Sequence, residues 1–151
     1  MKVLSVKNPW AYLICIGVKD VENRSWTTKY RGTLLIHVPS KNAGQVSVLS
    51  SCTKEQMQAI EGKGVFHPQH PMCSDTCISS IIGMVDLVDC VTNSQSIWAE
   101  AFFCHWILKN PVLFDHPIEN VSGQLNIWDY YGLDLEYVTV NSKKIFSDEN
   151  Y

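Results

Sequence analysis

Long apolar runs are missing from this chain of 151 residues, and their absence excludes a membrane-spanning helix. No run approaches the ~18 consecutive apolar residues that a bilayer requires. The first five residues contain no signal-peptide pattern and instead predict a strand. Internal repeats and low-complexity segments are also lacking. With 46% hydrophobic and 18% charged residues, the composition is typical of one globular domain, and no membrane is expected as a partner.

Arginine is scarce, since only Arg24 and Arg31 occur in the chain. The net charge of -3 argues against a general nucleic-acid coat. The charges are nevertheless unevenly distributed, with seven lysines and arginines against two acids in residues 1–41 and two lysines against seven acids in residues 111–151. This asymmetry predicts one local anion-binding surface on an otherwise acidic body. The alternative is a set of lysines that are simply solvated on an exposed face.

The cysteines do not predict a disulfide framework, although six of them are present. Cys15 falls within an apolar helical pattern and Cys90 within an apolar strand pattern. At such positions a reduced thiol packs as a small hydrophobic side chain. We therefore expect an intracellular, cytoplasmic protein whose cysteines are mostly reduced.

The first helix is predicted directly after an opening strand. Asn8 is interpreted as its N-cap, Pro9 as its first helical residue and Gly17 as the left-handed residue at its end. Further along, a β-branched strand is predicted over 33–38 and a longer one over 79–91. Between them, Thr53 and Gln56 form a capping box that begins a second helix.

A third helix is predicted from Ser94 or Ser96 to the residues before Asn110-Pro111. Its apolar residues would be Trp98, Ala99, Phe102, Phe103 and Trp106, and we assign both tryptophans to the core. Short strands are predicted over 111–115 and 124–128. Several short strands with two or three helices, in no regular alternation, favour a mixed α+β fold.

Lys19, Glu22 and Arg24 are the strongest candidates for a functional cluster. Side chains two apart on a strand share a face, so Glu22 and Arg24 point together, and Lys19 joins them if it lies in the preceding turn. Such a cluster can anchor an anion or polarise a carbonyl while the carboxylate activates water. The alternative is a structural ion pair at the rim of a barrel.

These residues belong to an ordered pattern, G-x-K-x-x-E-x-R-x-W, followed by Y-R-G and I-H-x-x-x-K. The pattern resembles the ASCH family (activating signal cointegrator homology), a branch of the PUA-like superfold. The residues that carry the resemblance are Pro9, Trp10, Ala11, Gly17, Lys19, Glu22, Arg24, Trp26, Tyr30, Arg31, Gly32, Ile36, His37 and Lys41. Residues 82–90 and 126–128 look like later strands of the same family, so the resemblance spans roughly residues 3–130.

The resemblance implies a PUA-like barrel with a cleft between the barrel and its helices. We predict a single domain over residues 1–134, with an insertion at about 42–78. Residues 135–151 would form an edge strand over 135–140 and a loose polar tail.

One branch of the ASCH family removes the acetyl group from N4-acetylcytidine with a lysine, a threonine and a glutamate. Lys19 matches its lysine, but Glu22 stands where that branch has threonine, so a threonine nucleophile cannot be carried over. Water activated by Glu22 could replace it, and Glu100 is aligned loosely with the glutamate. Other members are described as cleaving RNA or as binding DNA or RNA.

The family pattern here is closer to the binding members, so we predict binding of RNA or a nucleotide-like ligand. The alternatives are an N4-acetylcytidine-type amidohydrolase or a ribonuclease in the same cleft, and a protein-interaction module. The residues predicted to line the cleft or contact the ligand are Pro9, Trp10, Lys19, Glu22, Arg24, Trp26, Tyr30, Arg31, His37, Ser40 and Lys41. Arginine suits phosphate, tryptophan can stack on a base, and a buried histidine bonded to backbone is the alternative for His37.

The segment 65–77 adds a separate hypothesis, a structural zinc site. Its candidate ligands are His67, His70, Cys73 and Cys77, which have the identity and number of a tetrahedral site. Their spacing is tighter than that of common zinc fingers, and the ASCH resemblance implies no required cofactor. The alternative is a proline-rich surface loop with incidental or mutually paired cysteines.

Overall fold

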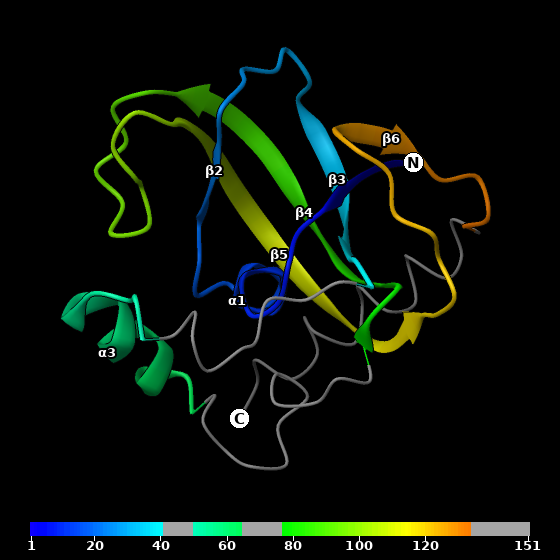
Figure 1. The fold of residues 1–151 in the computed structure, drawn as a ribbon, viewed down its shortest axis with the longest axis horizontal. Helices are drawn as coiled ribbons and strands as arrows, with labels where there is room; N and C mark the ends of the chain where they lie inside the picture. The colour runs from blue at the N-terminus through cyan, green and yellow to red at the C-terminus, as the bar shows by residue number, and fades with distance from the viewer. Residues whose placement is uncertain (41–49, 65–76, 134–151) are drawn as a thin grey trace.

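Six strands form one curled sheet in the computed structural model, which describes residues 1–40, 50–64 and 77–133. The sheet order is β2-β5-β4-β3-β1-β6, so β2 and β6 lie at its two edges (Figure 1). Among these six strands, only β1 and β3 pair in parallel. The strands are β1 (Lys2–Ser5), β2 (Val21–Arg24), β3 (Gly32–Val38), β4 (Ser80–Val91), β5 (Cys104–Ile118) and β6 (Ile127–Asp129).

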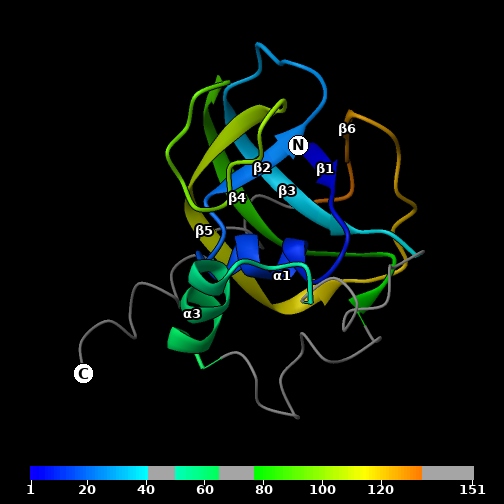
Figure 2. The ribbon, with the colours of Figure 1, turned by 60° about the vertical axis from the view of Figure 1, so that its left-hand side comes forward.

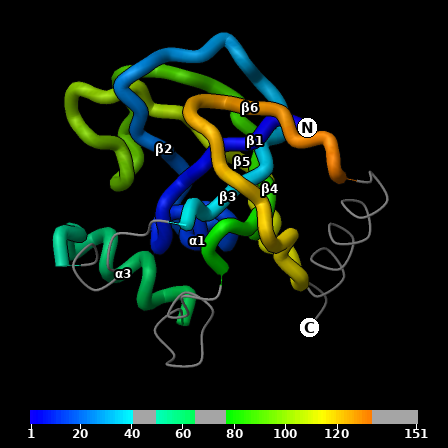
Figure 3. Tube along the Cα trace, turned by 45° about the vertical axis from the view of Figure 1, so that its right-hand side comes forward, coloured from blue at the N-terminus to red at the C-terminus, as the bar shows by residue number. Residues whose placement is uncertain are grey.

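The sheet curls into a half-barrel, and the described residues add two helices, α1 (Trp10–Cys15) and α3 (Lys54–Gly62). Helix α1 packs against β3, β4 and β5, while α3 lies to one side of it (Figure 2). At the far edge, β6 runs antiparallel to β1 near the N-terminus (Figure 3). The predicted small α+β barrel of PUA-like type is confirmed.

Helix α1 begins one residue later than the sequence predicts. Pro9 occupies the cap position, no side chain caps the helix, and the first helical residue is Trp10, so the prediction of an Asn8 cap is wrong. The predicted end is confirmed, because Gly17 has a φ of +76° and its N–H donates to the Ile14 carbonyl at 3.0 Å. A left-handed glycine is the usual way to stop a helix and turn the chain.

Helix α3 has the predicted capping box. The Gln56 backbone N–H donates to Thr53 Oγ1 at 3.2 Å, and the Thr53 N–H donates to Gln56 Oε1 at 2.9 Å. The Gln56 side chain also donates to the Ile97 carbonyl at 2.8 Å. Gln56 therefore takes part in capping the start of α3 and also attaches the helix to the β4–β5 loop.

The predicted third helix is wrong, because residues 92–103 form a loop and β5 begins at Cys104. Phe102 has a φ of +70°, outside the right-handed helical region, and its side chain is fully exposed. Trp98 and Trp106 are buried as expected, at 3% and 0% exposure. Trp98 reaches the core from the loop and Trp106 from β5, so their helical spacing arises without a helix.

Strand β5 also continues through Asn110-Pro111, where the sequence predicts a break. The register with β4 shifts there, because Met84 pairs with Val112 and Asp86 with Lys109. The extra residue forms a bulge, a position at which a strand tolerates proline. The predicted strand over 111–115 is thus part of β5, and the predicted strand over 124–128 is reduced to β6.

Gly83 on β4 provides a test of how closely β5 and α1 pack around this position. A Cβ at this position would lie 2.2 Å from the Val112 carbonyl oxygen and 2.7 Å from Cys15 Sγ. We expect Gly83→Ala to lower the free energy of unfolding by about 1–3 kcal/mol, as overpacking does, measured by urea denaturation. Gly62→Ala is the control, because nothing lies within 4 Å of its Cβ position and helix propensity should raise stability by roughly 0.5 kcal/mol. Equal stability of the two variants would contradict the close packing.

Candidate functional site

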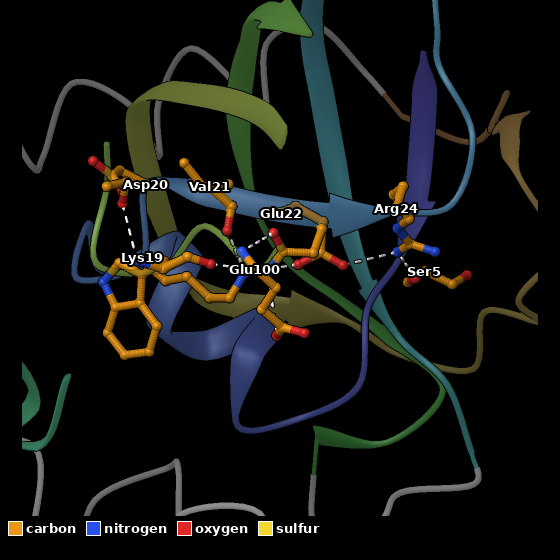
Figure 4. Close-up of polar contacts among 10 residues, drawn as sticks. Ser5, Lys19, Asp20, Val21, Glu22, Arg24 and Glu100 are labelled. Carbon is orange, nitrogen blue, oxygen red and sulfur yellow. Dashed lines mark hydrogen bonds and ion pairs between the residues drawn. The ribbon is translucent and has the colours of Figure 1, made fainter. Parts of the chain in front are cut away.

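One carboxylate shared by two cations forms the centre of the site. Glu22 lies on β2, Lys19 lies in the turn before it and Arg24 lies two residues further along the strand (Figure 4). The Lys19 ammonium is 2.9 Å from Glu22 Oε2, and Arg24 Nη2 is 3.2 Å from Glu22 Oε1. Lys19 also donates to the Val21 carbonyl. The turn before β2 thus brings all three side chains together.

The cluster is buried but not neutral. Lys19 is 6% exposed and Glu22 is 9% exposed, and removing such charges from water costs several kcal/mol per ion unless they are paired. Two cations share one carboxylate, so the cluster keeps a formal charge of about +1. Arg24, about a quarter exposed, also donates to the Ser5 carbonyl at 2.9 Å. An anion nearby would balance the remaining charge.

Two cavities meet at β2, because Glu22 and Asn23 line both of them. The larger has a volume of about 730 Å³ and is bordered by the ends of β1, β2 and β3, the start of β4 and the loop before β6. The smaller has a volume of about 340 Å³ and lies between β2, α3 and the β4–β5 loop. Both volumes are of the size that small-molecule sites occupy.

The smaller cavity brings together the three residues predicted as catalytic, Lys19, Glu22 and Glu100. Glu100 reaches it from the β4–β5 loop, not from the predicted helix. Asn23 holds this loop, because its Oδ1 accepts from the Glu100 backbone N–H at 3.0 Å and its Nδ2 donates to the Trp98 carbonyl at 2.9 Å. The predicted Trp10 lines the same cavity.

Trp10 and Trp98 form an aromatic pair at the smaller cavity. Their ring centroids lie 6.0 Å apart and the ring planes meet at 68°, the edge-to-face arrangement that aromatic rings favour. The indole of Trp10 is partly exposed, whereas that of Trp98 is buried. The cavity therefore combines an aromatic wall with polar side chains.

His37 supports the larger cavity from the core and does not line it. Its Nε2 donates to the Val121 carbonyl at 2.9 Å, which leaves Nδ1 to accept from the Ser5 hydroxyl at 3.0 Å. A Cβ at Gly123 would lie 2.5 Å from His37 Cε1, so the segment before β6 closes directly over the imidazole. The alternative interpretation of His37 therefore holds: it is a buried histidine that is bonded to the backbone.

Several other predicted residues lie away from both cavities. Arg31 pairs with Asp89 at 3.1 Å, and the Tyr30 hydroxyl donates to the Thr33 carbonyl at 2.6 Å. Trp26 packs edge-on against the core residue Trp106 at 4.6 Å, and Pro9 serves as the cap position of α1. Ser40 does line the larger cavity, whereas Lys41 lies outside the described residues.

The zinc hypothesis falls mostly on residues that the structure does not describe, namely His67, His70 and Cys73. Cys77 is described and is a free thiol, as are Cys15, Cys52, Cys90 and Cys104. Within the described ranges no group of three or more histidine, cysteine, aspartate or glutamate side chains could hold a metal ion. In the same ranges no helix is long and apolar enough to cross a membrane.

Lys7 and Asn23 are functional candidates that the sequence patterns missed. Lys7 is exposed and lines the larger cavity, and Asn23 lines both cavities while holding the β4–β5 loop. The signal for Asn23 was its place between Glu22 and Arg24. Lys7 follows Ser5 by two residues, so the two side chains share a face if the strand continues. That spacing by itself does not indicate a cavity.

The PUA-like half-barrel and its charged turn before β2 define the class of this domain, and comparison with known proteins agrees. The family model of the ASCH domain matches residues 4–118. The chain belongs to the ASCH domain family.

Two curated relatives are the human and mouse proteins named activating signal cointegrator 1. The human protein is 37% identical over 92 residues, covering 61% of this chain and 15% of that protein. The mouse protein is 36% identical over 135 residues, covering 83% of this chain and 21% of that protein. The chain thus spans about a fifth or less of the length of these relatives.

His37, which supports the larger cavity, makes the stability of the protein depend on pH. Burial lowers the pKa of His37 below its ordinary 6.5, and the bond to the Val121 carbonyl offsets this only partly. Below pH 6.5 the unfolded chain therefore binds more protons at this residue than the folded chain does, and stability falls as the pH drops toward the folded pKa. We expect the melting temperature to fall between pH 7 and pH 5, and to fall less in His37→Gln. An identical pH dependence in both proteins would contradict this role.

Proposed function

We propose that this ASCH domain binds RNA, or a nucleotide-like ligand, across the two cavities that meet at β2. The observation that carries the proposal is the buried cluster of Lys19, Glu22 and Arg24, whose excess positive charge lies in the wall between the cavities. Membership of the ASCH family supports a general RNA-binding role. The activities of the much longer relatives are not needed for the proposal.

The chemistry of the two cavities fits a nucleotide. Arg24 is held by Glu22 and by the Ser5 carbonyl, so its planar guanidinium is ordered before a ligand arrives. Ordered guanidinium groups favour phosphate because they present several donors in a fixed plane. On the other side of β2, Trp10 offers a partly exposed ring against which a base can pack.

A second candidate function is hydrolysis in the smaller cavity, of an N4-acetylcytidine-type nucleoside or of RNA. The observation that favours it is the meeting of Lys19, Glu22 and Glu100 at one cavity. Against it, both Glu22 oxygens are already paired with cations and the Lys19 ammonium already donates to two acceptors. Little of either group remains to activate water, so Glu100 would have to act as the base.

The two arginines of the chain form a matched pair for testing RNA binding. We expect Arg24→Gln to weaken binding of a single-stranded RNA oligonucleotide about tenfold or more, because a charge-assisted phosphate contact is lost. The slope of log affinity against log salt should also become shallower by about 0.7. Arg31→Gln removes the same charge outside both cavities and should change neither quantity. Fluorescence anisotropy at two or more salt concentrations measures both, with circular dichroism to confirm folding.

Equal losses in the two variants would reduce the effect to general charge and contradict a site at β2. Failure of the wild-type protein to bind RNA, mononucleotides and nucleosides would overturn the proposal. The protein-interaction module would then remain as the third hypothesis.

The hydrolytic candidate is tested by incubating the protein with N4-acetylcytidine and measuring cytidine and acetate by chromatography. It predicts release of both products by the wild type and at least about a hundredfold slower release by Glu100→Gln, as loss of a general base produces. Glu100 is exposed, so its replacement should leave the fold intact. Product release that is unchanged in Glu100→Gln, or absent from the wild type, would exclude this role of Glu100 on that substrate.

A further inference from the structure

We infer that the larger cavity is a phosphate subsite and that the smaller cavity takes the base, so the ligand is a nucleotide unit oriented across β2. The phosphate subsite is defined by Lys7, Arg24, Ser40 and Ser122. The inference rests on the proposed function and adds the direction in which the ligand lies. It also assigns a role to Lys7.

Among the described residues, the larger cavity has more cations nearby than acids to neutralise them. Lys7 is exposed and, within the described part of the chain, has no ion-pair partner. Among the described residues that line this cavity, the only carboxylate is Glu22, whose two oxygens are already paired with Lys19 and Arg24. A phosphate here would therefore meet two cations and no uncompensated acid, which is the arrangement that phosphate sites require.

Neutral hydrogen-bond donors complete the phosphate subsite. Ser40 and Ser122 both line the larger cavity and are exposed, so their hydroxyls can turn toward a ligand. Ser40 comes from the segment after β3 and Ser122 from the loop before β6, while Lys7 follows β1. Donors from three separate segments and from β2 thus surround one volume of about 730 Å³.

The smaller cavity has the opposite character. Of the described residues that line it, Glu22 and Glu100 are acids and Lys19 is the single cation, and the Lys19 ammonium already donates to Glu22 and the Val21 carbonyl. A phosphate in this cavity would face the Glu100 carboxylate at close range and be repelled. A neutral base would instead find the Trp10 ring for packing and the Glu100 carboxylate as a hydrogen-bond acceptor.

The polarity of the two cavities fixes the orientation of the ligand. Positive charge gathers at the larger cavity, whereas a hydrogen-bond acceptor and an aromatic ring line the smaller cavity. Glu22 and Asn23 line both, so one small molecule that bridges them crosses β2 at these two residues.

The test compares the four 5′-ribonucleoside monophosphates with the four corresponding nucleosides by isothermal titration calorimetry. We expect at least one monophosphate to bind about tenfold or more tightly than its nucleoside, because the phosphate adds charge-assisted contacts. Lys7→Ala should reduce this advantage, because it removes one of the two cations of the subsite, and should leave nucleoside binding unchanged. Lys109→Ala removes the same charge from an exposed position on β5 that lines neither cavity, and should preserve the advantage.

The outcomes separate this inference from the proposed function. If no monophosphate binds more tightly than its nucleoside, or if Lys7→Ala and Lys109→Ala act alike, the phosphate subsite is overturned. RNA binding that still depends on Arg24 would in that case leave the proposed function standing. If RNA, monophosphates and nucleosides all fail to bind, both proposals fall together.

Discussion

The bridge of Glu22 between Lys19 and Arg24 is the interaction on which the site depends. It ties the turn after α1 to β2, and through Arg24 it reaches the Ser5 carbonyl at the end of β1. Strands β1 and β2 are not neighbours in the sheet, so the Arg24 side chain crosses the opening of the half-barrel. The larger cavity lies at that crossing, lined by both strands. A fully closed barrel would leave no such opening.

The smaller cavity depends on the β4–β5 loop, whose backbone is hydrogen-bonded by side chains of β2, α3 and β5. Asn23 bonds the Trp98 carbonyl and the Glu100 N–H, and Gln56 of α3 bonds the Ile97 carbonyl. His105 completes the support, since its Nε2 donates to the Glu100 carbonyl at 2.8 Å and its Nδ1 accepts from a backbone N–H at 3.2 Å. Backbone bonds from side chains thus give an irregular loop a fixed course, and Glu100 a fixed place.

Local features of the site could be predicted from sequence, and features set by long-range contacts could not. Lys19, Glu22 and Arg24 lie within six residues, so turn and strand geometry alone brings them together. Arg31 matched the family pattern equally well, but its neighbours depend on β4, where Asp89 pairs with it. The apolar spacing before Trp106 fits a helix and a loop-strand junction alike, and the left-handed Phe102 together with the pairing of β5 to β2 and β4 distinguishes them.

The edge position of β2 explains why one strand can serve two cavities. A central strand has neighbours on both sides, whereas among the described strands β2 pairs only with β5, and at its other edge its own Arg24 side chain donates to the Ser5 carbonyl of β1. An unpaired edge invites association with other strands unless charges or covering segments protect it. Here the charged Arg24 occupies that edge, and the β4–β5 loop covers the strand near Asn23. The residues that protect the edge are thus the same ones that give the two cavities their opposite polarity.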